Sequence, residues 1–161
     1  MGSLSDIGLD TIEQFIYREA RYADEHDYTA WEALWTDDAI YWVPVDGGAH
    51  DPATHVSVIY DNRRRITTRL QQLRTGKRYA QSPPSNLRRT ISNVEILQRS
   101  GDETTAGANF VLYESKPRGI ETWAGRVTYV VRWVAGELKL ARKTVVLVNS
   151  AEALPTLGFL I

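Results

Sequence analysis

The spacing of apolar residues changes midway along the chain, and this change limits the possible folds more than any other feature of the sequence. In residues 10–73 apolar side chains recur about every 3.6 residues, the period of an amphipathic helix, as in the stripe through Ile12, Phe15 and Ile16. In residues 105–148 apolar and polar side chains alternate, which is the period of a half-buried strand. Helices followed by a run of strands predict an α+β fold, in which N-terminal helices pack against a mainly antiparallel sheet.

The first helix is expected near the start of the chain and a short second one after it. Asp10 and Glu13 have the spacing of a capping pair for the first helix. Its charged side chains, including Glu19 and Asp24, are expected on the solvent side, opposite the apolar stripe. Asp27 is a suitable N-cap for the second helix.

Two more elements are expected before the region of alternation. Asp37 and Asp38 should end the helical pattern, and the run Ala39–Pro44 favours a strand that is closed by proline. A third helix is expected from about Pro52 to Leu73, because apolar side chains continue at helical spacing there and proline is tolerated in a first helical turn.

The second part of the chain predicts strands that are joined by short turns containing proline or glycine. The expected strands cover residues 86–97, 105–115, 123–134 and 138–148. A curved sheet wrapped around the helices would form a cone that encloses a cavity. No repeat or linker interrupts the sequence, so we expect a single domain over residues 1–161.

Cysteine is absent, and the chain has only three histidines. This composition excludes disulfides, a thiolate nucleophile and cysteine-held zinc or iron–sulfur centres. No apolar run approaches the roughly 20 residues that span a bilayer, and residues 1–10 lack the pattern of a secretory signal. We therefore predict a cytoplasmic protein that binds no membrane, metal or redox cofactor of its own.

The net charge of −1 conceals an uneven distribution. Up to Asp61 there are thirteen acidic and two basic side chains, whereas between Asp61 and Glu95 there are nine basic and no acidic ones. Arginine outnumbers lysine fifteen to four, and its planar guanidinium suits ion pairs and protein interfaces. Because the isoelectric point is near 6.3 and only Tyr79 interrupts the basic segment, we expect pairing within the protein or with a protein partner rather than nucleic acid.

The histidines offer one possible metal motif. His50, Asp51 and His55 have the residue types of a two-histidine, one-carboxylate iron site. Their spacing does not match a zinc-binding helix, in which two histidines lie four residues apart on one face. We expect His50 and His55 to be ordinary polar residues of a loop and a helix start, and His26 to lie at a helix end.

A catalytic pocket would need acids or bases that face the inside of the cone. The last two expected strands contain no aspartate, glutamate or histidine. Residues on the helical side remain as the candidate set for a stand-alone dehydratase or isomerase. They are Tyr28, Asp38, Tyr41, His55 and Asp61.

Four segments resemble the small (β) subunit of bacterial aromatic-ring-hydroxylating, Rieske-type dioxygenases. They are YADEHDYTAWEALWTDDAIYWVP (Tyr22–Pro44), YDNRRRITTRL (Tyr60–Leu70), PPSNLRRTISNVEI (Pro83–Ile96) and KTVVLVN (Lys143–Asn149). The elements YDNR, PPS and RxISNV are specific in this order and spacing, and the similarity covers nearly the whole chain.

The resemblance implies a nuclear transport factor 2-like, or cystatin-like, cone and a non-catalytic role. It implies that a larger α subunit carries the Rieske iron–sulfur cluster and the mononuclear non-haem iron. Three α and three β chains are expected to assemble, and a ferredoxin and reductase would supply electrons to the complex. No catalytic, cofactor-binding or metal-binding residue is then expected in this chain.

The sequence leaves three hypotheses, of which the β subunit is the leading one. The second is the stand-alone cavity enzyme, and the third is a module that binds a ligand or dimerises without turnover. For the leading hypothesis we predict interface residues within the matching motifs. These are Trp42, Tyr60, Asp61, Arg63, Pro84 and Arg88.

Overall fold

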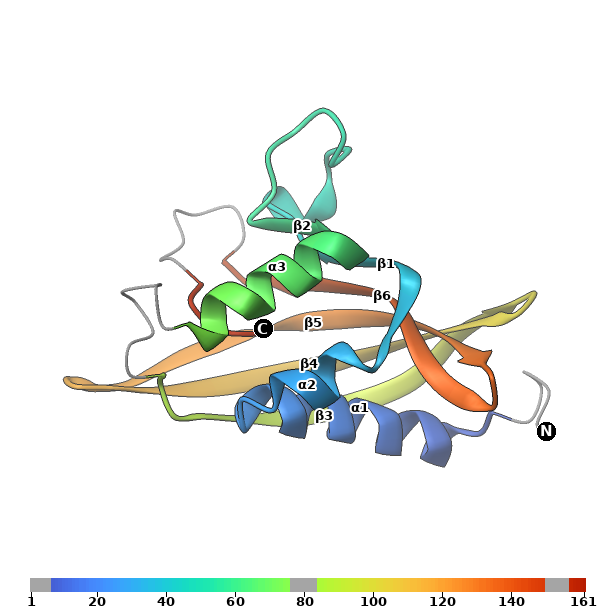
Figure 1. Cartoon of the computed structure of the whole chain (residues 1–161), viewed down its shortest axis with the longest axis horizontal. Coiled ribbons are helices and arrows are strands. Elements are labelled where there is room, and N and C mark those ends of the chain that lie inside the picture. Colours follow the sequence, from blue (N-terminus) through green and yellow to red (C-terminus); the bar gives the residue numbers. More distant parts are fainter. Residues whose placement is uncertain (1–6, 76–83, 150–156) are drawn as a thin grey trace.

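The computed structural model describes residues 7–75, 84–149 and 157–161, and a six-stranded sheet is its main element (Figure 1). The helices are α1 (Leu9–Asp24), α2 (Tyr28–Glu32) and α3 (Arg63–Arg74). The strands are β1 (Trp35–Val43), β2 (Ile59–Asn62), β3 (Leu87–Ser100), β4 (Glu103–Lys116), β5 (Gly119–Val134) and β6 (Glu137–Leu147).

The strands lie in the order β2-β1-β6-β5-β4-β3. Four of the five neighbouring pairs are antiparallel, and the β1–β6 pair is parallel. Two-residue turns join β4 to β5 and β5 to β6, as the proline and glycine positions indicated. The predicted α+β class and the mainly antiparallel sheet are confirmed.

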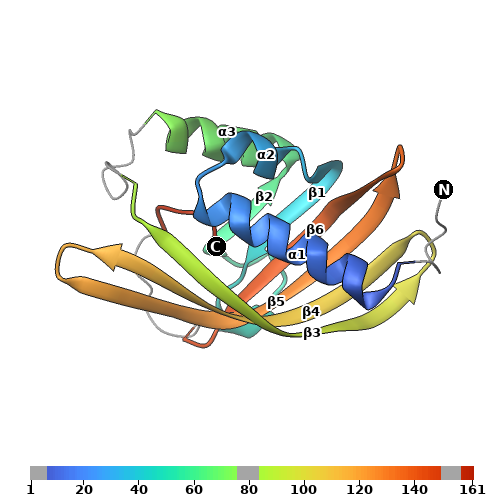
Figure 2. The ribbon, with the colours of Figure 1, turned by 90° about the horizontal axis from the view of Figure 1, so that it is seen from below.

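The sheet curves around α1, which contacts β3, while α3 contacts β1 and β2 at the other end of the sheet (Figure 2). Ile12, Phe15 and Ile16 of α1 are buried as their spacing predicted. Trp123 and Tyr129 of β5 are buried as well and share one side of the sheet, because alternate residues of a strand point to the same side. Residues 157–161 are also buried and occupy the inside of the cone together with these side chains.

The predicted helix over Pro52–Leu73 is wrong in its first half. Residues 59–62 form β2, in which Tyr60 is paired with Trp42 of β1. The helix begins only at Arg63, because the side chain of Asn62 accepts a hydrogen bond from the Arg65 N–H and caps it. The residues before β2 form a loop, 44–58, that projects from the body (Figure 1).

Two smaller expectations about helix ends also fail. Helix α1 begins at Leu9 with Gly8 as its N-cap and no capping side chain, so Asp10 lies within the first turn. Asp37 and Asp38 lie inside β1, where the register with β6 is irregular. By contrast, Asp27 caps α2 as predicted, with its carboxylate accepting from the Ala30 N–H.

Candidate functional site

Two ion pairs lie inside the cone, and we call them the inner ion pairs: Glu19–Lys143 and Asp24–Arg89. Glu19 on α1 and Lys143 on β6 are each 1% exposed, and their charged atoms are 3.0 Å apart. The Nε1–H of Trp31 also donates to Glu19, at 2.7 Å. Burial lowers the pKa of Lys143, and the adjacent Glu19 carboxylate opposes this shift.

The second inner ion pair links three separate parts of the chain. The Nε of Arg89 on β3 lies 2.7 Å from one carboxylate oxygen of Asp24, and its backbone N–H donates to the other. The same guanidinium donates to the backbone carbonyl of Leu160, at 2.7 Å. The end of α1, the start of β3 and residues 157–161 are therefore joined by one arginine.

Two tyrosines are also buried in the interior. The hydroxyl of Tyr41 donates to the carbonyl of Ile161 at 2.7 Å and accepts from its N–H at 3.0 Å. Burial raises the pKa of Tyr41, and burial together with the charge of Glu19 raises that of Tyr129. Both phenols are therefore neutral at ordinary pH. The interior groups are arranged to hold the helices, the sheet and residues 157–161 together.

The sequence placed Glu19 and Asp24 on the solvent side of α1, and this prediction is wrong. Both residues are buried because α1 is covered along a wider stripe than the apolar residues alone indicate. Glu19 lies seven residues after Ile12, on the same helical face. Lys143 lies two residues before Val145, so both side chains point to the inner face of β6. The spacing of Glu19 and Lys143 therefore indicated inward positions, but the charge of Glu19 led to the expectation of solvent exposure.

The candidate catalytic set is not brought together. Asp38 is exposed on β1 and bound by Arg132, with Oδ1 and NH1 2.9 Å apart. Hydrogen bonds from Thr36 and Arg132 lower the pKa of the Asp38 carboxyl, and the bond from Thr36 has the larger effect. His55 lies exposed in the projecting loop, where its ring stacks on that of His50 at 4.3 Å.

The other members of that set have partners of their own. Asp61 is buried and forms an ion pair with Arg69 of α3, with Oδ2 and Nε 2.6 Å apart. Tyr41 is the register partner of Asp61, but its hydroxyl is bound to Ile161. Tyr28 is half-buried, with its hydroxyl 3.4 Å from Nδ1 of His26. These five candidates, all within the described residues, therefore form no assembled acid–base group for the cavity-enzyme hypothesis.

Among the predicted interface residues, Trp42 and Tyr60 are the most closely associated. Their rings meet edge-on across the β1–β2 pair, with centroids 6.2 Å apart. The guanidinium of Arg142 lies over the Trp42 ring, 5.4 Å from its centroid. Tyr60 is 36% exposed and Trp42 is half-buried. This aromatic pair lies on the outer face of the sheet, opposite the inner ion pairs.

The remaining predicted interface residues lie in two places. Arg63 begins α3, directly after β2, and forms an ion pair with Glu32, at 2.9 Å. Pro84 lies before the start of β3, and Arg88 is the second residue of that strand. Both residues are exposed. Arg88 borders an open cleft of about 540 Å³ with Tyr113 and Ile120. The predicted set therefore does not form one continuous patch.

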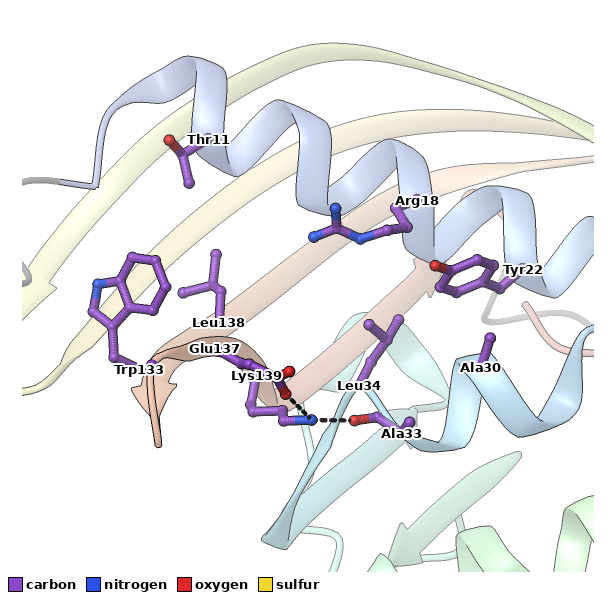
Figure 3. A pocket seen from close by; sticks show the side chains of 11 residues that line it. Thr11, Arg18, Tyr22, Ala30, Ala33, Leu34, Trp133, Glu137, Leu138 and Lys139 are labelled. Carbon is purple, nitrogen blue, oxygen red and sulfur yellow. Dashed lines mark hydrogen bonds and ion pairs between the residues drawn. The ribbon is translucent and has the colours of Figure 1, made fainter. Parts of the chain in front are cut away.

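A second open cleft, of about 490 Å³, lies between α1, α2 and the β5–β6 hairpin (Figure 3). Arg18 and Tyr22 line it from α1, and Leu138 lines it from the hairpin. The Nζ of Lys139 donates to the Ala33 carbonyl at 2.6 Å, which ties the hairpin to the end of α2. The sequence did not indicate this cleft, because it depends on how the hairpin folds over the helices.

The motif with His50 and His55 does not form a metal centre. Within the ranges 7–75, 84–149 and 157–161 no group of three or more histidine, cysteine or acidic side chains is arranged to hold a metal ion. In the same ranges, no helix has the length and apolar character needed to cross a membrane.

Comparison with known proteins gives one consistent family. A family model described as ring hydroxylating beta subunit matches residues 18–152. The chain is 30% identical to the small subunit of 2-halobenzoate 1,2-dioxygenase from Burkholderia cepacia, over 92% of this chain and 93% of that one. It is 27% identical to the β subunit of benzoate 1,2-dioxygenase from Acinetobacter baylyi, over 91% and 89%.

Solved structures agree with this result. The β subunit of benzoate 1,2-dioxygenase from Burkholderia mallei superposes with a TM-score of 0.77 at 28% identity, over 92% of this chain and 94% of that chain. An NTF2-like protein with a cystatin-like fold from Novosphingobium aromaticivorans superposes with a TM-score of 0.60 at 16% identity, over 86% and 80%. The second likeness concerns the fold alone and confirms the predicted cystatin-like cone.

Proposed function

The chain belongs to the ring hydroxylating beta subunit family, and we propose that it supports the assembly of larger, iron-bearing α subunits in an aromatic-ring-hydroxylating oxygenase. Its relatives are small or β subunits of dioxygenases named for benzoate and 2-halobenzoate. We assign it to the catabolism of aromatic compounds, as a structural subunit that contributes no catalytic residue.

The observation that supports this proposal is that Glu19 and Asp24, two acids of the interior, are held in ion pairs. Glu19 and Asp24 are each neutralised by a buried cation, and both are packed within the core. A general base must reach a proton of its substrate, directly or through one water molecule. An acid that binds a lysine or arginine inside the packed core is suited to fixing the fold instead.

The cofactors of the oxygenase belong to the α subunit in this proposal. A Rieske iron–sulfur cluster and a mononuclear iron supply the oxygen chemistry there, and a ferredoxin and reductase supply electrons. The described part of this chain does not fit either group, since no three metal-ligating side chains converge in it. Three α and three β chains form the assembly, and its cytoplasmic location stays a prediction.

We propose two contact regions: the start of β3 at one edge of the sheet, and β1, β2 and the start of α3 at the other. Trp42 and Tyr60 supply aromatic contacts there, and aromatic residues and arginine are enriched at interface hot spots. Asp61 acts indirectly, because it is buried and holds Arg69 of α3. The other contacts in the proposal are Arg63, Pro84 and Arg88.

Co-expression of the chain with its α subunit tests this function. We expect the two polypeptides to co-elute in gel filtration as one brown complex that contains iron and acid-labile sulfide. The β chain purified alone should be colourless. Separate elution of the two chains at micromolar concentration would contradict the proposal.

A further inference from the structure

The uneven charge distribution along the sequence is largely neutralised within the fold. The structure describes seven arginines between residues 63 and 89, and five of them lie within 4.0 Å of a carboxylate from the acidic first part of the chain. These pairs are Arg63–Glu32, Arg69–Asp61, Arg74–Glu32, Arg88–Glu25 and Arg89–Asp24.

Arg64 and Arg65 are the exceptions. Both side chains are exposed on α3, and neither forms an ion pair with a carboxylate in the described part of the chain. Opposite charge is available elsewhere in the molecule, as the five pairs demonstrate. These two adjacent cations are therefore directed to solvent, or to a partner.

The position of the two arginines is unfavourable for the isolated chain. They occupy the first turn of α3, immediately after Arg63, and this turn contains no acidic residue. Positive charge near the N-terminus of a helix opposes the helix dipole and lowers stability. A local choice that works against the fold is typical of residues kept for function.

The neighbourhood of the two arginines favours a protein partner. Tyr60 lies four and five residues before them on β2, and its ring contacts that of Trp42 on β1. Tryptophan, tyrosine and arginine are the residues that dominate protein interfaces. A nucleic-acid site would need a broader basic surface, whereas the other described arginines of this segment are neutralised.

We propose that Arg64 and Arg65 bind carboxylates on an acidic surface of the α subunit. This inference rests on the proposed function and adds the chemistry of the contact. Two adjacent exposed guanidinium groups would provide directional contacts to aspartate or glutamate. Because the arginines are exposed in the free chain, they would also accelerate association at low ionic strength.

The test compares the Arg64→Glu/Arg65→Glu variant with the wild-type chain in two measurements. The affinity for the α subunit, measured by biolayer interferometry at low salt, should fall at least about 10-fold, and its dependence on salt should weaken. The melting temperature of the isolated variant should be equal or higher, because acidic residues favour a first helical turn. A loss of affinity therefore cannot be attributed to unfolding.

Arg118→Glu provides the control, since Arg118 is exposed in the β4–β5 turn and the charge change at the substituted position is the same as at each of Arg64 and Arg65. Its affinity for the α subunit should equal that of the wild type. Equal affinity of the double variant would overturn this inference and leave the proposed function intact. Failure of the wild-type chain to bind the α subunit would overturn both. Binding of a 20-base-pair DNA duplex that the double variant loses would overturn the inference in favour of nucleic acid.

Discussion

Lys143 and Glu19 place opposite charges in the middle of an apolar core. Removing charges from water is unfavourable, and the attraction between them compensates only when both partners remain. The Trp31 indole adds a third group to this arrangement through its hydrogen bond to Glu19. At the scale of single residues, the interior is therefore specified by pairs that depend on each other.

Substitution of one partner should be far more harmful than substitution of both. We expect Lys143→Met to lower the free energy of unfolding by about 3–5 kcal/mol, because Glu19 is left buried and unpaired. The double variant Glu19→Gln/Lys143→Met should recover most of this loss, since glutamine still accepts from Trp31. Urea unfolding of the three proteins measures the difference.

Arg126→Met is the control for an exposed ion pair. Arg126 lies 3.0 Å from Glu95 on the outer face of the sheet, and its replacement should cost less than about 1 kcal/mol. If Glu19→Gln/Lys143→Met is as unstable as Lys143→Met, the unpaired charge of Glu19 does not account for the loss of stability.

The buried tyrosines give a prediction about alkaline pH. Burial raises the pKa of Tyr41 and Tyr129 in the folded chain, so the native state holds these protons more tightly than the unfolded state. Their contribution to stability is complete below the unfolded pKa of about 10 and is lost as the pH rises toward the higher folded pKa. Tyrosinate absorbance should therefore include a fraction that appears only as the chain unfolds.

The variant Tyr41→Phe/Tyr129→Phe should remove this late fraction. Tyr113→Phe serves as its control, because Tyr113 is exposed on β4. Retention of the late fraction in the double variant would contradict the assignment.

At the scale of the elements, the strands of the second half follow from sequence because alternation is a local property. The strand β2 does not follow from sequence, because its four residues form a strand only by pairing with β1. The local sequence of β2 does not indicate which distant segment will lie beside it. The same limit applies to the site. Glu19 and Lys143 occupy inward positions that their spacing indicates, but their pairing depends on how α1 lies across β6.

The start of α3 should depend on its cap. Asn62→Ala removes the acceptor for the Arg65 N–H and should lower the free energy of unfolding by about 1 kcal/mol. Asn62→Asp should retain most of the stability, because aspartate is an equivalent cap. Thermal unfolding measures both, and equal stability of the alanine variant would show that the cap does not fix this helix.

At the scale of the whole molecule, the charge asymmetry of the sequence is resolved by the fold. The basic middle segment pairs with the acidic first segment at several positions along α1, α2 and β2. The sequence predicted pairing within the protein or with a partner, but not which arginines would take which role. The distinction between Arg89, which is buried, and Arg64, which is exposed, requires the structure.

The chain belongs to the ring hydroxylating beta subunit family, and the central claim of this account is that it supports the assembly of an oxygenase. The most direct test is the turnover of a panel of aromatic compounds. It is measured with electron-transfer proteins for the β chain alone and for the complex with its α subunit. We expect oxygen-dependent product from the complex and none from the β chain. Saturable turnover by the isolated β chain would contradict the account.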